Sequence, residues 1–152
     1  QLGNETYFFA RHVFNAPPFI STDGTMQQLK NAGNLRLIKN ESIINKILAY
    51  DAQVKELNEW DESDTRIRTT FREIGGSVFN ADELYKAMDS NFKFVRPTTN
   101  PQLITDNPIT INNVAFQIQY LSLSSLGNTQ RGKALKEKAE KLIELLKHQY
   151  HL

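Results

Sequence analysis

Apolar residues recur at alternating spacings of four and three along two long parts of the chain. The first part, about residues 41–75, carries Ile43, Ile47, Tyr50, Val54 and Leu57, and similar spacing resumes at Ile67, Phe71, Ile74 and Val78. Such spacing lines one face of an α-helix with apolar side chains, as in a coiled coil. The pattern predicts a long helix over about 41–75. Because the two seams differ in phase, we expect local overwinding or a change of packing partner near Trp60.

A second apolar seam runs through the C-terminal part of the chain without losing its phase. Its members are Val114, Ile118, Leu121, Ser125, Asn128, Gly132, Leu135, Ala139, Leu142 and Leu146. A break between two helices would normally lose this register, so the seam predicts one helix over about 111–150. An antiparallel pair would bring its small or polar middle to the height of the polar stretch at 59–64, which favours a hairpin-like spine. The alternative is that these are two solvated stretches whose heights match by coincidence.

Three shorter helices are predicted at about 4–14, 23–32 and 81–89. Pro17-Pro18 ends the first, Thr22 or Asp23 begins the second, and Asn80 caps the third. The sequence therefore predicts an all-α fold: a helical bundle built on two long antiparallel helices, with these shorter helices beside them. Residues 1–152 are expected to form a single helical domain with an irregular connection at about 90–108, where three prolines exclude a continuous helix.

The stretch AGNLRLIKN is interpreted as a corner between two helices. Gly33 would take the left-handed conformation at the end of the second short helix, and Asn40 would cap the long helix that follows. Three apolar residues between them would bury the corner: Leu35, Leu37 and Ile38. A phosphate-binding loop would need several glycines leading into a helix, whereas here one glycine follows a helix.

Composition excludes several classes of chemistry. The formal net charge is +1, from 18 basic and 17 acidic residues, so no global field favours nucleic acid. Cysteine is absent, which excludes thiol nucleophiles, disulfides and thiolate metal sites. The histidines lack the spacing of a zinc site, and no nucleotide or nucleophile-elbow motif occurs. We therefore expect no metal, no cofactor and no nucleic-acid partner.

One cluster of carboxylates could in principle support catalysis: Glu56, Glu59, Asp61, Glu62 and Asp64, flanked by Arg66 and Arg68. On a helix these positions point around much of the circumference, so they do not converge. A solvated helix face is the better interpretation. Two carboxylates meeting an arginine in a cleft would be needed for an enzyme, and we expect the protein not to be one.

The N-terminal aromatic helix offers a candidate ligand pocket. Tyr7, Phe8 and His12, together with Trp60, could line a cavity for a small molecule. The alternative is that His12 is a partly buried core residue with one satisfied hydrogen bond. Arg36 and Lys39 are the candidates for surface contact with another molecule.

A family resemblance is carried by TMQQLKNAGNLRLIKN and the following helix that ends in ILAYD. This motif, over about residues 25–51, resembles an uncharacterised family of Bacteroidetes proteins. The resemblance implies a single-pass, membrane-anchored protein with a helical domain on the periplasmic side of the inner membrane. Since the chain begins with Gln1, we expect that an N-terminal anchor was removed. The resemblance implies no activity and no catalytic residues.

Two functions are expected on these grounds. The first is a non-enzymatic extracytoplasmic interaction or sensor-type module, with a homodimer or a helical protein as partner and the membrane reached only through the removed anchor. An apolar groove left by that segment, filled by a second copy, would fit this function. The alternative is a small-ligand-binding sensor domain with its pocket near the N-terminal aromatic helix and Trp60.

Overall fold

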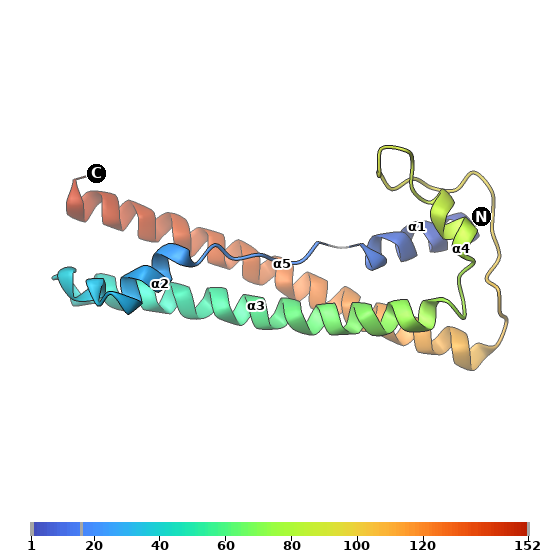
Figure 1. Cartoon of the computed structure of the whole chain (residues 1–152), viewed down its shortest axis with the longest axis horizontal. Helices are drawn as coiled ribbons and strands as arrows, with labels where there is room; N and C mark the ends of the chain where they lie inside the picture. Colours follow the sequence, from blue (N-terminus) through green and yellow to red (C-terminus); the bar gives the residue numbers. More distant parts are fainter. Residues whose placement is uncertain (1, 16, 152) are drawn as a thin grey trace. The chain divides into compact units, whose positions relative to one another are not determined.

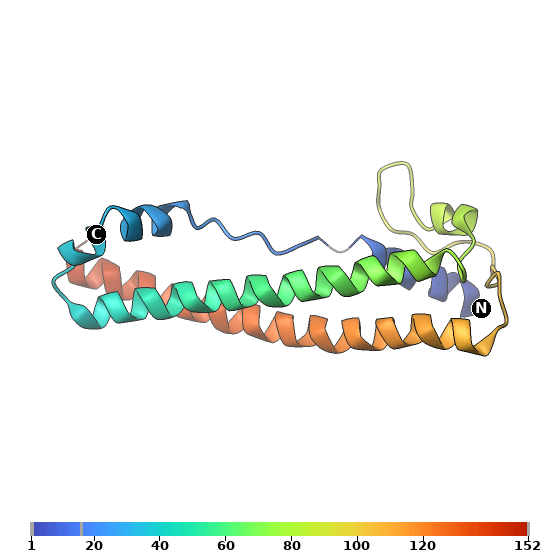
Figure 2. The same cartoon turned by 60° about the horizontal axis from the view of Figure 1, so that its bottom comes forward.

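The computed structural model describes residues 2–15 and 17–151. Its elements are α1 (Leu2–Phe14), α2 (Gly24–Asn31), the 3₁₀ turn η1 (Asn34–Leu37), α3 (Glu41–Gly75), α4 (Ala81–Lys86) and α5 (Pro108–Tyr150). The two long helices, α3 and α5, run antiparallel (Figures 1 and 2). The fold is an all-α bundle built on this pair, as the sequence predicts.

α5 begins three residues earlier than predicted. Pro108 is its first residue, and the side-chain oxygen of Asn107 accepts hydrogen bonds from the backbone N–H groups of Ile109 (2.9 Å) and Thr110 (3.1 Å). Proline is favoured at a first helical position because its missing N–H would have no helical partner there. The assignment of Pro108 to the irregular connection was therefore wrong.

α4 ends three residues earlier than predicted, at Lys86. Beyond it, the backbone N–H of Val95 donates to the carbonyl oxygen of Ala87 at 3.0 Å, and Met88 forms an isolated antiparallel bridge with Phe94. The hydrogen bond from Val95 takes the carbonyl oxygen of Ala87, which another helical turn would use. The predicted cap is confirmed, since the Asn80 side chain accepts from the first turn of α4.

The corner between α2 and α3 is partly as predicted. Gly33 adopts the left-handed conformation with φ +64°, and the Asn40 side chain accepts from the backbone N–H of Ser42 at 3.0 Å. The corner itself contains η1, which was not predicted. Leu37 is 70% exposed, so the prediction that it buries the corner was wrong.

α3 is one continuous helix, and a buried carboxylate fills the gap between its two predicted seams. Asp64 lies seven residues after Leu57 and seven before Phe71, and all three side chains are buried. The Ser124 hydroxyl of α5 donates a hydrogen bond to Asp64. The polar middles of the long helices therefore meet, although through Ser124 and not through Ser125, which is exposed.

The chain divides into two compact units. Unit 1 contains the residues up to Pro18 and residues 63–124, and unit 2 contains residues 19–62 and the C-terminal part from Ser125. The division lies between Glu62 and Ser63, close to Trp60, where a change of packing partner was predicted. The prediction of a single domain stays a prediction.

Unit 1 has an aromatic core built where α1 packs on its parts of α3 and α5. The buried members of this core are Tyr7, Ala10, Phe71, Val78, Phe79 and Val114. The hydroxyl of Tyr7 donates to the carbonyl oxygen of Gln102 (3.0 Å) and accepts from the backbone N–H of Asn80 (2.8 Å). A buried tyrosine thus has both hydrogen-bond capacities used, which holds α1 against the 78–102 region.

Unit 2 has a smaller, aliphatic core. Its buried apolar residues are Ile43, Ile47, Leu57 and Leu135, and one charged side chain, Asp51, is also buried. None of the residues of α2 is buried. Burial of apolar side chains therefore does little to hold α2 in unit 2. Polar contacts hold it in place instead.

Candidate functional site

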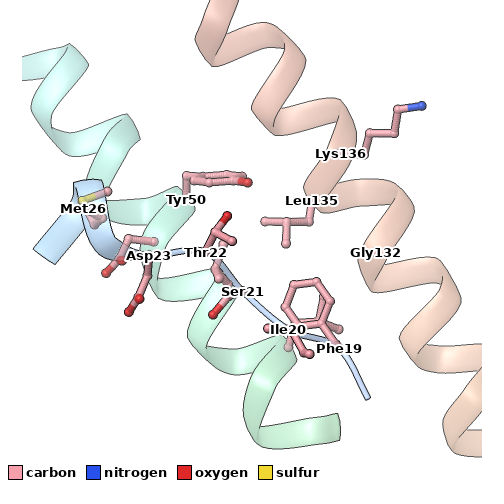
Figure 3. Close-up of a pocket in the computed structure, with 13 residues that line it drawn as sticks. Phe19, Ile20, Ser21, Thr22, Asp23, Met26, Tyr50, Gly132, Leu135 and Lys136 are labelled. Carbon is pink, nitrogen blue, oxygen red and sulfur yellow. The ribbon is translucent and has the colours of Figure 1, made fainter. Parts of the chain in front are cut away.

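A pocket of about 360 Å³ lies within unit 2, between the 19–23 segment, α3 and α5. It is lined by Phe19, Ile20, Ser21, Thr22, Asp23, Met26, Tyr50, Asp51, Val54, Leu57, Gly132, Leu135 and Lys136. In Figure 3, Tyr50 of α3 and Leu135 of α5 point toward each other, with Ser21 and Thr22 near them, while Lys136 points away. The volume falls at the small end of the range for ligand pockets in proteins.

Two polar contacts position the wall of this pocket. The side-chain amide of Asn58 donates to the hydroxyl of Ser21 at 3.0 Å, which fixes the 19–23 segment on α3. Lys30 of α2 forms an ion pair with the buried carboxylate of Asp51, and Lys55 approaches the same carboxylate at 3.3 Å. The pocket therefore depends on side chains that tie the 19–30 region to α3.

The ion pair changes the titration of both partners. The hydrogen bond from Lys30 is the main cause that lowers the pKa of Asp51, and burial of the carboxylate opposes it. The hydrogen bond to Asp51 raises the pKa of Lys30 above its ordinary value. Both groups are therefore held in their charged forms near neutral pH. The Asp51 carboxylate is engaged by two lysines, so its role is to hold α2 in place.

The lining of the pocket combines apolar side chains with polar ones. Aromatic and aliphatic side chains form most of the wall, and hydroxyl groups of Ser21, Thr22 and Tyr50 supply neutral hydrogen-bonding groups. A Cβ added to Gly132 would meet no atom within 4 Å, so open space lies beside this part of α5. The hydroxyl oxygen of Ser21 accepts a hydrogen bond from the side-chain amide of Asn58. Three charged residues, Asp23, Asp51 and Lys136, also line the pocket, so it offers an apolar wall with polar and charged groups at its edge.

The residues proposed from sequence as a ligand pocket lie in both units. Tyr7, Phe8 and His12 belong to unit 1, and Trp60 belongs to unit 2, so a joint cavity stays a prediction. Tyr7 is a core residue. Trp60 is 41% exposed, and the Arg131 guanidinium lies 4.1 Å from its ring centroid, a cation–π distance.

His12 lies in a row of rings in unit 1. Its ring centroid is 4.4 Å from that of Phe8 and 4.4 Å from that of Phe94, and Arg96 lies over Phe8 at 4.2 Å. His12 Nδ1–H donates to the carbonyl oxygen of Phe8 at 2.9 Å. One hydrogen bond is satisfied, as the alternative interpretation expected, but the side chain is exposed.

The carboxylates of α3 have different surroundings. Asp64 is buried and accepts from Ser124, whereas Glu56, Glu59 and Glu62 are exposed. Within the described residues, no three histidine, cysteine, aspartate or glutamate side chains gather as metal ligands.

The two surface candidates at the α2–α3 corner are exposed, as predicted. Arg36 lies in η1, and Lys39 lines a shallow depression of about 520 Å³ with Leu37, Asn40, Gln149 and Tyr150.

Sequence reasoning missed a surface of α5 in unit 1. Phe116, Tyr120 and Leu123 follow one another at spacings of four and three, and they are 55%, 54% and 62% exposed. Ile109, seven residues before Phe116, is also exposed, and we call these four residues the α5 stripe. The stripe lies on the side of α5 opposite to the buried Val114 and Leu121, and the spacing of its members was its signal in the sequence.

No protein-family model, curated protein or solved structure matches the chain. None of the helices in the described part of the chain combines the length and apolar content required to cross a membrane.

Proposed function

We propose that this protein is a non-enzymatic helical interaction module that associates with a second copy of itself through the α5 stripe. The observation that carries the proposal is the stripe itself: four large apolar side chains, two of them aromatic, exposed on one face of one helix. Exposed apolar surface of this kind marks interaction sites in soluble proteins. Aromatic residues are also enriched in the cores of protein interfaces.

The charge around the stripe favours a second copy as partner. No charged residue occurs between Asp106 and Arg131, so this part of α5, which includes the stripe, is neutral. In a two-fold dimer the same surface meets itself, so a charge near the two-fold axis would face its own like charge. A neutral apolar face avoids that repulsion. The C-terminal part of α5, by contrast, carries a dense mixture of lysine and glutamate from Lys133 onward.

The aromatic pair gives the stripe a fixed shape. The rings of Phe116 and Tyr120 have centroids 5.2 Å apart with an interplanar angle of 50°. Each ring limits the rotation of its neighbour, so less side-chain entropy is lost when a partner covers them. The Tyr120 hydroxyl can also keep a hydrogen bond at the edge of an interface.

The proposal is tested by sedimentation velocity on three proteins at matched concentrations: wild type, Leu123→Glu and Ile143→Glu. Leu123→Glu would place a charge in the stripe and is expected to give monomers. Ile143 is another exposed aliphatic residue of α5, outside the stripe, so Ile143→Glu is the matched control and should remain dimeric. Equal loss of the dimer in both variants, or a monomeric wild type, would refute the stripe as the interface.

Ligand binding is a second candidate function, and the 360 Å³ pocket beside Tyr50 favours it. We place this candidate at that pocket, while a cavity near Tyr7, Phe8, His12 and Trp60 remains the alternative predicted from sequence. Gly132→Leu would project a side chain into the open space at α5. A small apolar molecule found by a thermal-shift screen should stabilise the wild type and not Gly132→Leu. Equal stabilisation of both would place binding elsewhere.

We further propose that the module acts outside the cytoplasm, tethered by an N-terminal anchor to the inner membrane. The resemblance carried by about residues 25–51 supports this location. Protease added to intact spheroplasts that express the full-length protein should degrade the domain. Protection that ends only when the spheroplasts are lysed would contradict this location.

A further inference from the structure

A second apolar surface lies in unit 2, between α3 and α5. It is a groove of about 440 Å³, lined by Lys46, Ala49, Tyr50, Lys138, Lys141, Leu142 and Leu145. Ala49 and Tyr50 come from α3 and the two leucines from α5, and together they form the apolar floor. The floor is open to solvent on one side, since Ala49 is exposed and both leucines are only half-buried.

The rim of this groove is positively charged. Lys46 of α3 and both Lys138 and Lys141 of α5 line it, and no acidic residue does. The ion pairs found in the described part of unit 2 use other lysines: Lys30 and Lys55 with Asp51, and Lys136 with Glu140. The groove therefore combines an apolar floor with cationic groups around it.

The charge is only partly offset by neighbours on the same helices. Glu137 and Glu144 lie four residues before and three after Lys141 on α5, where side chains of a helix can meet. The residues three and four positions from Lys46 on α3 are all uncharged. Two copies of this groove facing each other would bring lysine against lysine, so a second copy of the chain is a poor occupant.

The groove is short, and its length limits the size of the ligand that it can bind. Its α5 wall runs from Lys138 to Leu145, which is about 10 Å at a helical rise of 1.5 Å per residue. An amphipathic helix needs anchors over two or more turns and a broader floor than four apolar residues supply. A single alkyl chain needs only a narrow apolar trough, with one anionic group placed near the ammonium groups at the rim.

We propose that this groove binds a single-chain anionic amphiphile with a fatty-acid carboxylate as its head group. The alkyl chain lies on Ala49, Tyr50, Leu142 and Leu145, where burial of each methylene stabilises the complex. The carboxylate pairs with the lysines at the rim. These pairs are solvent-exposed, so they select the sign of the ligand's charge more than they add affinity.

The test uses decanoate as the probe, 1-decanol as its neutral counterpart, and isothermal titration calorimetry on the full chain. Decanoate should bind more tightly than decanol, and its affinity should fall as salt is added, because exposed charges are screened. The double variant Lys46→Gln/Lys141→Gln should weaken decanoate about tenfold, at the upper range for two exposed ion pairs, and leave decanol unchanged. Lys147→Gln, on α5 outside the groove, is the matched control and should have no effect.

A second variant separates the apolar floor from the charge. Ala49→Phe fills the trough at an exposed position, so the protein should fold while binding of both probes is lost. Equal affinity for decanoate and decanol, or decanoate binding that Ala49→Phe leaves intact, would overturn the proposal. Binding of an acidic amphipathic peptide without binding of decanoate would also overturn it, as would a change in solution mass caused by Ala49→Phe, which would identify a second copy as the occupant.

Discussion

Unit 1 and unit 2 contain parts of the same two long helices, yet they pack them against different material. In unit 1, α1 covers the pair with Tyr7 and Ala10, and the core contains Phe71 and Phe79 in contact with Phe14. In unit 2, the 19–23 segment and α2 lie beside the pair, and none of the residues of α2 is buried. An aromatic third layer packs on the pair in unit 1, whereas a pocket and a groove lie beside the pair in unit 2.

This difference in packing suggests that one unit contributes most of the stability and the other most of the capacity to bind a ligand. Close aromatic packing excludes space for a ligand, and it contributes most of the apolar burial of a small domain. A layer held by an ion pair and one amide hydrogen bond leaves cavities that a ligand can occupy. We therefore expect unit 1 to be the stable part and unit 2 the adaptable part, and the changes below test that contrast.

The largest expected effects come from truncating buried side chains. Phe71→Ala in unit 1 should lower the free energy of unfolding by about 3–5 kcal/mol, because it leaves a cavity among packed rings. Leu121→Ala and Leu135→Ala are a matched pair on α5, one in each unit. We expect the free energy of unfolding to fall by about 3 kcal/mol in Leu121→Ala and by about 2 kcal/mol in Leu135→Ala, since Leu135 already lines a pocket. Urea denaturation measures all three.

The difference in stability loss between Leu121→Ala and Leu135→Ala tests whether the two units are packed equally tightly. Leu135→Ala costing as much as Leu121→Ala would mean that unit 2 is packed as tightly as unit 1. Trp60 fluorescence reports on unit 2, and far-ultraviolet circular dichroism reports on helix content throughout. Transitions that differ between these probes would show that the units unfold separately.

A smaller effect is expected from the ion pair that holds α2. Asp51→Asn should lower the free energy of unfolding by about 1–2 kcal/mol near neutral pH, since it leaves Lys30 without its carboxylate partner. Lys55→Gln is the milder comparison and should cost about 0.5 kcal/mol, because that lysine is largely exposed. Thermal unfolding at several pH values measures both variants against the wild type.

The pH dependence of this pair has a defined sign. A lowered folded pKa means that Asp51 stabilises the fold above its unfolded value, about pH 4, and that the stabilisation is lost as pH falls through the folded pKa. A raised pKa means that Lys30 stabilises below about pH 10.4 and loses this as pH rises through the folded value. The gap between wild type and Asp51→Asn should therefore close at both extremes. A gap that stays constant from pH 3 to neutral would contradict the ion-pair assignment.

The smallest effects are expected from two glycines, with opposite signs in the two units. A Cβ at Gly75 would lie 2.8 Å from Cζ of Phe14, so Gly75→Ala should cost about 1 kcal/mol by displacing a core ring. Gly132→Ala meets no atom within 4 Å and should add about 0.5–1 kcal/mol by favouring the helix. Chemical denaturation gives both values. If Gly75→Ala were stabilising, the Phe14 ring would have to move aside at little cost in free energy, which would contradict tight packing in the core of unit 1.

The long helices and their capping residues could be predicted from the sequence because they depend on local pattern. Periodic apolar residues gave the extent of α3, and Asn40 and Asn80 act as the caps that their positions suggested. The start of α5 was misplaced by three residues because the cap at Asn107 was overlooked. A uniform register also indicated one helix in the C-terminal part, although the stretch SLGNTQRG (residues 125–132) looks like a break between two helices.

The sites could not be predicted in the same way. The 19–23 segment has no apolar period, and its path depends on the contacts Asn58–Ser21 and Lys30–Asp51, which join residues far apart in sequence. The pocket follows from that path. The spacing of the α5 stripe was visible in the sequence, but spacing alone does not show whether another helix of the same chain covers a face. The structure shows that Leu123 is exposed.

Self-association through the α5 stripe is tested most directly by the solution mass of the wild-type chain, measured by light scattering over a concentration series beside Leu123→Glu. The monomer mass is 17.4 kDa. We predict that the wild-type mass rises toward twice this value with concentration, while Leu123→Glu stays at the monomer mass. A wild-type mass that remains at 17.4 kDa at every concentration would contradict the proposed interaction module.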